Sequence, residues 1–520
     1  MLRGESPCVR ARVPVLLLMF AAPTAAAQAP RLGSIEFPTS GAPAAQPHFL
    51  RGVLYLHSFE YGSAATAFRE AQRLDPGFAM AYWGEAMTYT HPVWNEQNVA
   101  AARAALGRLA PTPEARAAKA GTERERAYLA AVEALYGEGS KARRDTVYAL
   151  AMERLASEQP DDLEARAFHA LAILALNQGV RDQQAYERAG AIALGVLEKN
   201  PDHPGGAHYV IHAFDDPLHA KQGLEAARAY SKIAPDAAHA QHMTTHIFLA
   251  LGMWDEVVSQ NEIASHHTDW RSGHYVSWYA YGLLQLGRRR EAAVVLERAR
   301  KNWPANLGPA LRFMRAHQVI LTERWDDPSL DWDIPDPAGT TPRAIEHFVR
   351  GYAAVQRGDR QQAQARRSRL ATLAEEATRK GDTPTERALP GILGSELEAA
   401  ILHTEGRSHD ALTVLQQAAE REASLPVEFG PPYIVKPTFE LLGEALLALD
   451  RPAEAVRAFT RALELAPRRA TSLLGLARSA DKAGDAALAV QTWETLAEVW
   501  RNADPEVPAL AEVRRRVAAR

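Results

Sequence analysis

The histidines of this chain form a repeated pattern that could bind a metal ion. The sequence contains 18 histidines, and ten of them lie between residues 203 and 274. His208 and His212 are four residues apart, as are His242 and His246, and the second pair follows the first after 34 residues. Residues four apart share one face of a helix. We therefore expect the four imidazoles to converge on one point if the two helices are neighbours.

An imidazole cluster of this kind is typical of a divalent transition-metal site. Zinc, copper, nickel and iron(II) all accept imidazole nitrogen, and the sequence does not choose between Zn, Cu, Ni and Fe. One further histidine precedes His242 by three residues, on the same predicted helix face. The predicted metal ligands are His208, His212, His239, His242 and His246. Two alternatives stay open: a metal-free groove for a ligand, and a structural layer of hydrogen-bonded histidines.

Other polar and aromatic side chains near the two pairs are candidates for the wall of a ligand groove. Two acidic residues follow His212 after one helical turn, and a cluster of aromatic residues follows His246. These candidates are His57, Asp215, Asp216, His274, Trp278 and Tyr281. The chain contains no GxSxG, P-loop or HExxH motif, so the sequence singles out no catalytic residue.

The spacing of small, aromatic and proline residues predicts the helices that carry these histidines. Within residues 50–76 the pattern consists of Gly52, Tyr55, Ala64, Phe68, Ala71 and Pro76. Related patterns recur over residues 280–304 and 443–467. This is the spacing of tetratricopeptide repeats (TPRs), whose period is 34 residues. The sequence therefore predicts an all-α, TPR-like α-solenoid of about ten antiparallel helix pairs, with both histidine pairs on first helices that line its concave surface.

The composition is that of a folded protein without a strong charge bias. Of the 520 residues, 47% are hydrophobic and 23% charged, and the formal net charge is -4. This balance does not point to nucleic acid as a partner. The single cysteine excludes a disulfide framework and a multi-cysteine metal site. After the first thirty residues, no apolar run approaches the roughly 20 residues of a membrane span, so we expect none.

The N-terminus has the pattern of a secretory signal peptide. Arg3, Arg10 and Arg12 precede a short apolar run, residues 13–22, and small residues follow. We expect the signal peptide to cover residues 1–27 and the protein to be exported, either to a periplasm or out of the cell.

Four further parts are expected after the signal peptide. Residues 28–47 are predicted to be a flexible N-terminal tail, and 48–325 a TPR-like array with the histidine-rich groove. Residues 326–342 contain four prolines and five aspartates, which is typical of a linker and equally of a packed surface loop. A second TPR array is expected over 343–520.

Three segments resemble a family of exported bacterial TPR proteins with a histidine-rich central region. They begin at His57, His203 and His239 and read HSFEYGSAATAFREAQRLDPGFAMAYWGEAMTYTHPVW, HPGGAHYVIHAFDDPLHA and HAQHMTTHIFLALGMWDEVVSQNEIAS. The general TPR resemblance implies a scaffold for protein interactions, and it carries over no catalytic role.

These observations support two functions. The first is an exported scaffold that binds a peptide, protein or small ligand in its concave groove, with a divalent metal held by histidines. The second is a metal-dependent enzyme, of the hydrolase or oxidase class, with its site in the same groove.

Overall fold

The computed structural model describes residues 1, 29–176, 181–335, 339–380 and 383–518. The chain divides into a short unit, residues 1–30, and a compact unit from Arg31 to Arg520. The predicted signal peptide lies outside the described residues, apart from Met1. All the helices described below belong to the second unit.

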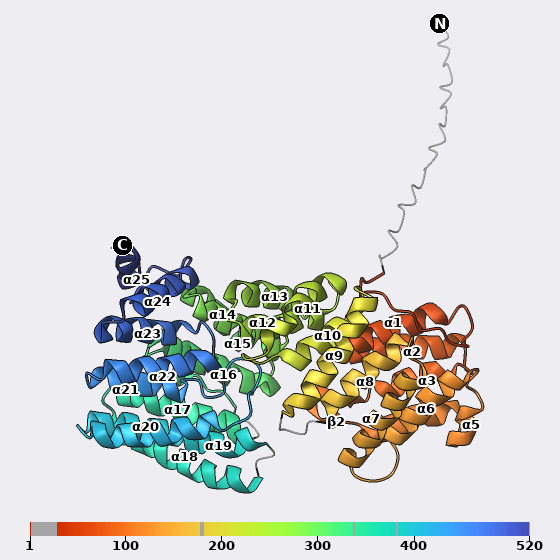
Figure 1. The fold of residues 1–520 in the computed structure, drawn as a ribbon, viewed down its shortest axis with the longest axis horizontal. Coiled ribbons are helices and arrows are strands. Elements are labelled where there is room, and N and C mark those ends of the chain that lie inside the picture. The colour runs from red at the N-terminus through yellow and green to blue at the C-terminus, as the bar shows by residue number, and fades with distance from the viewer. Residues whose placement is uncertain (2–28, 177–180, 336–338, 381–382, 519–520) are drawn as a thin grey trace. The chain divides into compact units, whose positions relative to one another are not determined.

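The first half of this unit consists of helices joined by short turns (Figure 1). Its helices are α1 (Gln46–His57), α2 (Tyr61–Leu74), α3 (Ala79–Met87), α4 (Val99–Leu109), α5 (Pro113–Ala117), α6 (Glu123–Leu135), α7 (Lys141–Glu158), α8 (Leu163–Ala175), α9 (Gln183–Lys199), α10 (Pro204–Phe214), α11 (Ala220–Ile233), α12 (Ala238–Ala250) and α13 (Trp254–His267). Two short strands, β1 (Thr90–His91) and β2 (Glu96–Gln97), pair antiparallel around the 3-10 helix η1 (Pro92–Trp94).

The second half continues in the same way. Its helices are α14 (Gly273–Gln285), α15 (Arg289–Asn302), η2 (Ala305–Leu307), α16 (Gly308–Thr322), η3 (Pro328–Asp331), α17 (Thr340–Gln356), α18 (Arg360–Lys380), α19 (Pro384–Thr404), α20 (Ser408–Ala423), α21 (Thr438–Ala448), α22 (Pro452–Leu465), α23 (Ala470–Ala483), α24 (Ala486–Val499) and α25 (Leu510–Ala518).

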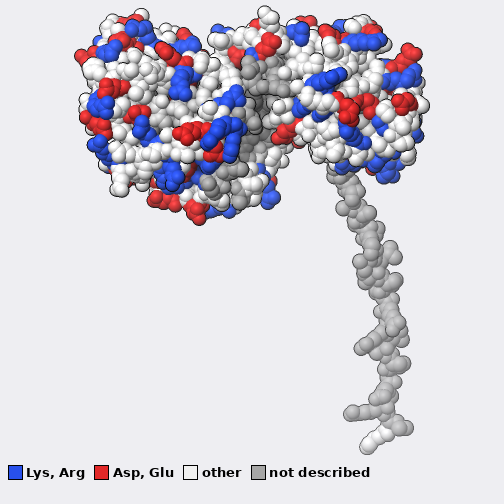
Figure 2. All heavy atoms as spheres, turned by 90° about the horizontal axis from the view of Figure 1, so that it is seen from below, with Lys and Arg blue, Asp and Glu red and all other residues white. Residues whose placement is uncertain are grey.

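Consecutive helices pack as pairs, and each pair packs on the next. The predicted all-α, TPR-like α-solenoid is confirmed. The described residues hold twenty-five α-helices, more than the ten pairs expected, because short elements such as α5 and α25 lack the repeat spacing. No described helix is both long enough and apolar enough to cross a membrane. On the face shown in Figure 2, acidic and basic side chains are interspersed.

Glycines at the predicted repeat positions let a phenylalanine fit between two helices. A Cβ on Gly52 of α1 would lie 2.6 Å from the ring of Phe68 on α2, and a Cβ on Gly443 of α21 would lie 2.7 Å from Phe459 on α22. Both phenylalanines are fully buried. The same contact recurs in these two repeats, almost 400 residues apart, because glycine is the residue that leaves room for the ring.

The segment expected to be a flexible tail, residues 28–47, is packed from Arg31 onward. Leu32 and Phe37 are buried, with 1% and 2% of their surfaces exposed. The backbone N–H of Ser40 donates to Glu125 on α6. Apolar side chains between the prolines thus anchor this stretch, which was expected to be a flexible tail, to the helices.

Residues 326–335 pack along α16, and part of this segment is buried. Ser329 and Leu330 of η3 are buried, and Arg315 Nη1 donates to the carbonyl oxygen of Ser329 at 3.0 Å. On either side of this stretch, α16 and α17 are in direct contact. The last three described residues of the expected linker, 340–342, form the first turn of α17.

The C-terminal helices return to the middle of the chain. Trp254 Nε1 on α13 donates to the carbonyl oxygen of Arg468 at 2.9 Å, and Trp500 Nε1 donates to that of Gln285 at 3.1 Å. One hydrophobic core includes residues from Ala167 to Ile334 and again from Ala470 to Val513. Segments far apart in the sequence therefore share one core.

Adding a methyl group at Gly443 should destabilise the fold. Gly443→Ala should lower the free energy of unfolding by about 1–3 kcal/mol, because the Cβ would meet the buried ring of Phe459. Urea unfolding followed by circular dichroism measures this change.

Gly107 provides the matched control, since it lies inside α4 with nothing within 4 Å of an added Cβ. Gly107→Ala should stabilise the protein by about 0.5–1 kcal/mol through helix propensity. Equal effects of the two substitutions would contradict the packing argument.

Candidate metal centre

The predicted histidine ligands lie on the first helices of consecutive helix pairs. α10 contributes His208 and His212, and α12 contributes His239, His242 and His246. α10 and α12 are in direct contact. All five side chains are buried, with 6% or less of each residue exposed. The repeat argument therefore placed them correctly on neighbouring helices.

The five imidazoles form two groups and not the single point of convergence that we expected. We call His208, His212 and His239 the first group, and His242, His246 and His274 of α14 the second group. In each group, one nitrogen from every ring lies within 4.8 Å of the others. The reason is that the histidines of α12 span two helical turns, so that one reaches towards α10 and the other two towards α14.

In the first group, the outer nitrogen of each ring has a partner and the inner nitrogen has none. The contacts of the outer atoms are His208 Nδ1 to the carbonyl oxygen of His57 (2.6 Å), His212 Nδ1 to Asp215 Oδ2 (3.7 Å) and His239 Nδ1 to the Tyr275 hydroxyl (3.3 Å). All three Nε2 atoms are buried without a hydrogen-bond partner among the described residues. Outer contacts of this kind orient histidines that ligate metals.

In the second group, hydrogen bonds determine which nitrogen carries the proton. His242 Nδ1 donates to Asn261 Oδ1 at 2.7 Å. The amide of Asn261 is itself oriented, because its Nδ2 donates to the carbonyl oxygen of Val257 at 2.9 Å. His246 Nδ1 donates to Asp215 Oδ2 at 3.2 Å. In the neutral state, both rings therefore leave Nε2 without a proton.

These two Nε2 atoms face each other at 3.2 Å. Two lone pairs at this distance repel, and a cation bound to both removes the repulsion. Two nitrogen ligands of a tetrahedral zinc ion, each at about 2.0–2.1 Å, lie roughly 3.3 Å apart. The pair His242 and His246 thus has the spacing of two metal ligands.

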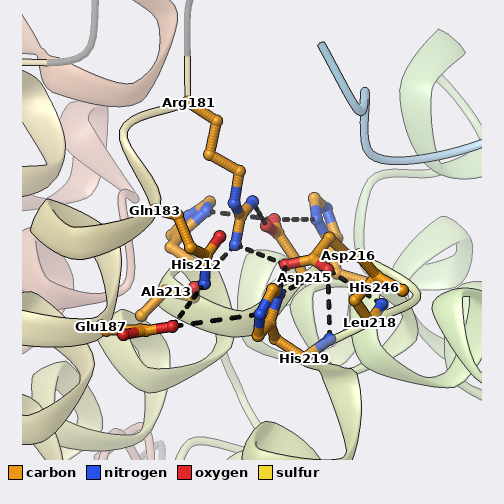
Figure 3. A network of polar contacts seen from close by, with 10 residues as sticks. All are labelled: Arg181, Gln183, Glu187, His212, Ala213, Asp215, Asp216, Leu218, His219 and His246. Atoms are coloured by element: carbon orange, nitrogen blue, oxygen red, sulfur yellow. Dashed lines mark hydrogen bonds and ion pairs between the residues drawn. The ribbon is translucent and has the colours of Figure 1, made fainter. Parts of the chain in front are cut away.

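Asp215 joins the two groups (Figure 3). Its Oδ2 faces His212 of the first group and His246 of the second, and Arg181 Nη1 donates to its Oδ1 at 2.8 Å. Burial alone would raise the pKa of Asp215, but hydrogen bonds from the two imidazoles and the charge of Arg181 hold it well below its usual value. The carboxylate is therefore ionised, accepts from His246 and faces His212 at 3.7 Å.

Asp216 does not contact the metal-ligand candidates in the described structure. Its Oδ2 lies 3.0 Å from Arg181 Nη2, and its Oδ1 accepts from His219 Nδ1 at 2.8 Å. Figure 3 shows both aspartates around the same guanidinium. Asp216 thus helps to hold Arg181, which in turn holds Asp215.

Phe59 covers the first group. Its ring centroid lies 4.3 Å from that of His208, 5.7 Å from that of His212 and 5.5 Å from that of His239. Its φ is 53°, a left-handed conformation that costs a bulky residue about 1–3 kcal/mol. Phe59 was not among the groove candidates, because a positive φ leaves no signal in this sequence.

Aromatic rings from two distant segments surround the second group. Trp278 of α14 stacks on His246 with centroids 4.6 Å apart, and it meets His242 edge-on at 4.8 Å. Phe429, between α20 and α21, lies 5.1 Å from His246. Trp278 was a groove candidate. Phe429 was missed, although its segment, residues 425–437, is a proline-rich interruption of the repeats.

The second group borders two cavities. One has a volume of about 380 Å³ and is lined by Asp215, His246, Tyr281 and Phe429, among others. The other, of about 590 Å³, is lined by residues including His274 and Phe429. His274 is exposed. Tyr281, a groove candidate, lines the first cavity and accepts a hydrogen bond from Arg469 at 3.0 Å.

His57, another groove candidate, belongs to a third buried group with Glu164 and His203. His57 Nε2 donates to Glu164 Oε2 at 2.7 Å, and its Nδ1 accepts from the Tyr209 hydroxyl at 2.9 Å. His203 Nε2 donates to Glu164 Oε1 at 3.1 Å, and its Nδ1 accepts from the N–H of Gly206 at 3.1 Å. Burial would raise the pKa of Glu164, but the two histidines lower it to about 2. Every ring nitrogen is used, so this group is structural.

The comparisons with known proteins agree with the repeat assignment. Residues 437–469 match the tetratricopeptide-repeat family. This segment is similar to a tetratricopeptide repeat. It includes α21 and α22, where Gly443 packs against Phe459. No curated protein matches the chain.

Several solved structures are similar to the chain at low identity. The Cut9–Hcn1 hetero-tetramer of APC/C matches with 13% identity and a TM-score of 0.27, and the match covers 92% of this chain and 97% of that chain. A human IFIT1 dimer with m7Gppp-AAAA matches with 14% identity, 93% and 91% coverage and a TM-score of 0.34. The P58(IPK) TPR domain matches with 14% identity, 92% and 99% coverage and a TM-score of 0.22. At these scores the likeness does not extend to the course of the whole chain.

The buried imidazoles should make the metal-free protein sensitive to acid. Burial and neighbouring imidazoles hold the pKa of His208, His239 and His242 well below its usual value. Below the unfolded pKa of about 6.5 the unfolded chain takes up protons that the folded chain does not, so stability falls as the pH falls. From pH 7 to 5, we expect a loss approaching about 1.4 kcal/mol per pH unit for each group.

Thermal unfolding of chelator-treated protein at several pH values measures this slope. His242→Gln should reduce it. His409→Gln should not, because His409 is exposed and distant in sequence from the cluster. An identical slope in all three proteins would contradict the assignment of these histidines as buried and neutral.

Proposed function

We propose that the protein is a helical-repeat scaffold that holds a divalent transition metal through histidines and binds a peptide, protein or small ligand beside it. The observation that carries this proposal is the arrangement of five buried imidazoles. They have outer nitrogens in contact with fixed partners, and inner nitrogens without a hydrogen-bond partner or facing one another at 3.2 Å. The sequence of residues 1–27 supports export to a periplasm or out of the cell.

The contrast with the third group supports metal binding over a purely structural role. In that group, Glu164 accepts from both His57 and His203, and each remaining nitrogen accepts from its own donor. The chain thus shows what a satisfied layer of buried histidines looks like. The first group departs from it, because three buried Nε2 atoms lack partners among the described residues. Leaving a buried polar atom unpaired costs about 1–3 kcal/mol, which metal ligation would recover.

Exposed apolar side chains beside the second group support a ligand with an apolar part. Leu218, Val427 and Phe429 line the 380 Å³ cavity and expose 75%, 41% and 42% of their surfaces. Large apolar side chains gathered on a surface typically mark a binding site. A peptide or small molecule that places an apolar group here would lie next to His246.

One observation favours the alternative function, a metal-dependent enzyme of the hydrolase or oxidase class. His246 and Asp215 border a cavity, so a substrate there would reach a metal at the second group. A screen of peptide, ester and oxidation activities on the metal-loaded protein tests this alternative.

Metal analysis of protein purified without a histidine tag tests the main proposal. The protein should contain at least one equivalent of a divalent transition metal, and His242→Ala plus His246→Ala should reduce the content, because both Nε2 ligands are removed. His403→Ala plus His409→Ala removes two exposed imidazoles and should leave the metal content unchanged.

Trace metal in the wild-type protein, unaltered by the His242 and His246 substitutions, would overturn the proposal. The far-ultraviolet circular dichroism of each variant shows whether it retains the helical fold.

A further inference from the structure

We infer that the two histidine groups bind one metal ion each, and that only the second ion is open to an external ligand. This inference rests on the proposed function and deepens it, because it replaces one shared site by two sites of different character. The second ion, at His242, His246 and His274, would take small anionic donors that enter from the cavities.

The number of ligands favours two ions. Three histidines with an open fourth position make a complete zinc-type site, and the chain provides two such sets. Within each set, the candidate ligand nitrogens lie within 4.8 Å of one another. The two sets adjoin each other, since the ring centroids of His212 and His246 are 5.9 Å apart and those of His239 and His242 are 6.1 Å apart. Six imidazoles exceed what one tetrahedral ion accepts.

The first group is enclosed. Its three Nε2 atoms are buried, and the ring of Phe59, which is itself 7% exposed, lies over all three imidazoles. Trp94 adds a second ring 5.9 Å from His239. An ion bound here would be surrounded by aromatic carbon and would exchange slowly with solvent.

The second group is open on the side of α14. His274 is exposed and lines the 590 Å³ cavity, while His246 lines the 380 Å³ cavity. Phe429 lines both cavities. A ligand can therefore approach this ion from solvent without displacing a buried side chain.

Asp215 acts as a positioning residue for both ions. One oxygen, Oδ2, faces Nδ1 of His212 and accepts from Nδ1 of His246. Removal of a residue that orients metal-ligating histidines in this way typically costs about 10–100-fold in metal affinity. Asp215→Asn should lower the affinity for both ions by this factor, because an amide oxygen cannot act as an anionic acceptor for two imidazoles.

Titration of the tag-free, chelator-stripped full chain with Co²⁺ tests the inference. Visible absorption and native mass spectrometry should show two ions per chain. His208→Gln plus His239→Gln should leave one ion, and His242→Gln plus His274→Gln should also leave one. His403→Gln plus His409→Gln, the matched control, should still bind two.

Azide then tests which ion is open. It should change the cobalt spectrum of the wild type and of the His208 and His239 variant, whose remaining ion is the second one. It should not change the spectrum of the His242 and His274 variant. EDTA should remove one ion from the wild type at least tenfold faster than the other.

Each outcome separates the inference from the proposed function. One ion in the wild type, lost in either double variant, would mean a single shared site, which overturns the inference and leaves the proposed function intact. No bound ion would overturn both. Two ions that both respond to azide, or that both ignore it, would overturn the assignment of one open site. If a double variant unfolds, the single variant His274→Gln is measured in its place, since this exposed residue can be replaced without opening the core.

Discussion

The buried carboxylate of Asp215 is the interaction on which the histidine cluster depends. A charge in the interior is costly unless it is paired and hydrogen-bonded. Asp215 meets this condition through Arg181 on one oxygen and two imidazoles on the other. Because an ionised carboxylate only accepts, it keeps the protons of His212 and His246 on Nδ1. It therefore leaves Nε2 of these two rings bare, while the His57 carbonyl, the Tyr275 hydroxyl and the Asn261 side chain orient the other three imidazoles.

The positions of the histidines along the chain could be predicted because they follow the repeat. A 34-residue offset between two i, i+4 pairs places them at equivalent positions of α10 and α12, and the structure has them on neighbouring buried helices. The same spacing rule located Gly443 against Phe459. In both cases, a local pattern is repeated often enough that chance is a poor explanation, and the helical period converts it into a place in space.

The division into two groups could not be predicted from spacing. It depends on the rotation of α12 between α10 and α14, which side-chain packing determines. Three residues that shape the site could also not be assigned to it from the sequence. Asn261 fixes the proton of His242 from a second helix, α13. Phe59 needs a positive φ to cover the first group, and Phe429 comes from a segment 183 residues beyond His246 in the sequence.

The two groups differ because their covers come from different parts of the chain. The last residue of α1 supplies the His57 carbonyl, which orients His208, and the turn that follows supplies the ring of Phe59. Gly205 on α10 lets this turn approach, since a Cβ there would collide with the His57 ring. The cover of the second group instead depends on the return of the C-terminal helices, which the buried Arg469 helps to hold by donating to Glu440 and Tyr281. A local turn makes a tight cover, whereas a long segment anchored from a distance leaves cavities beside it. The difference in access between the two groups therefore follows from the order of the helices along the chain.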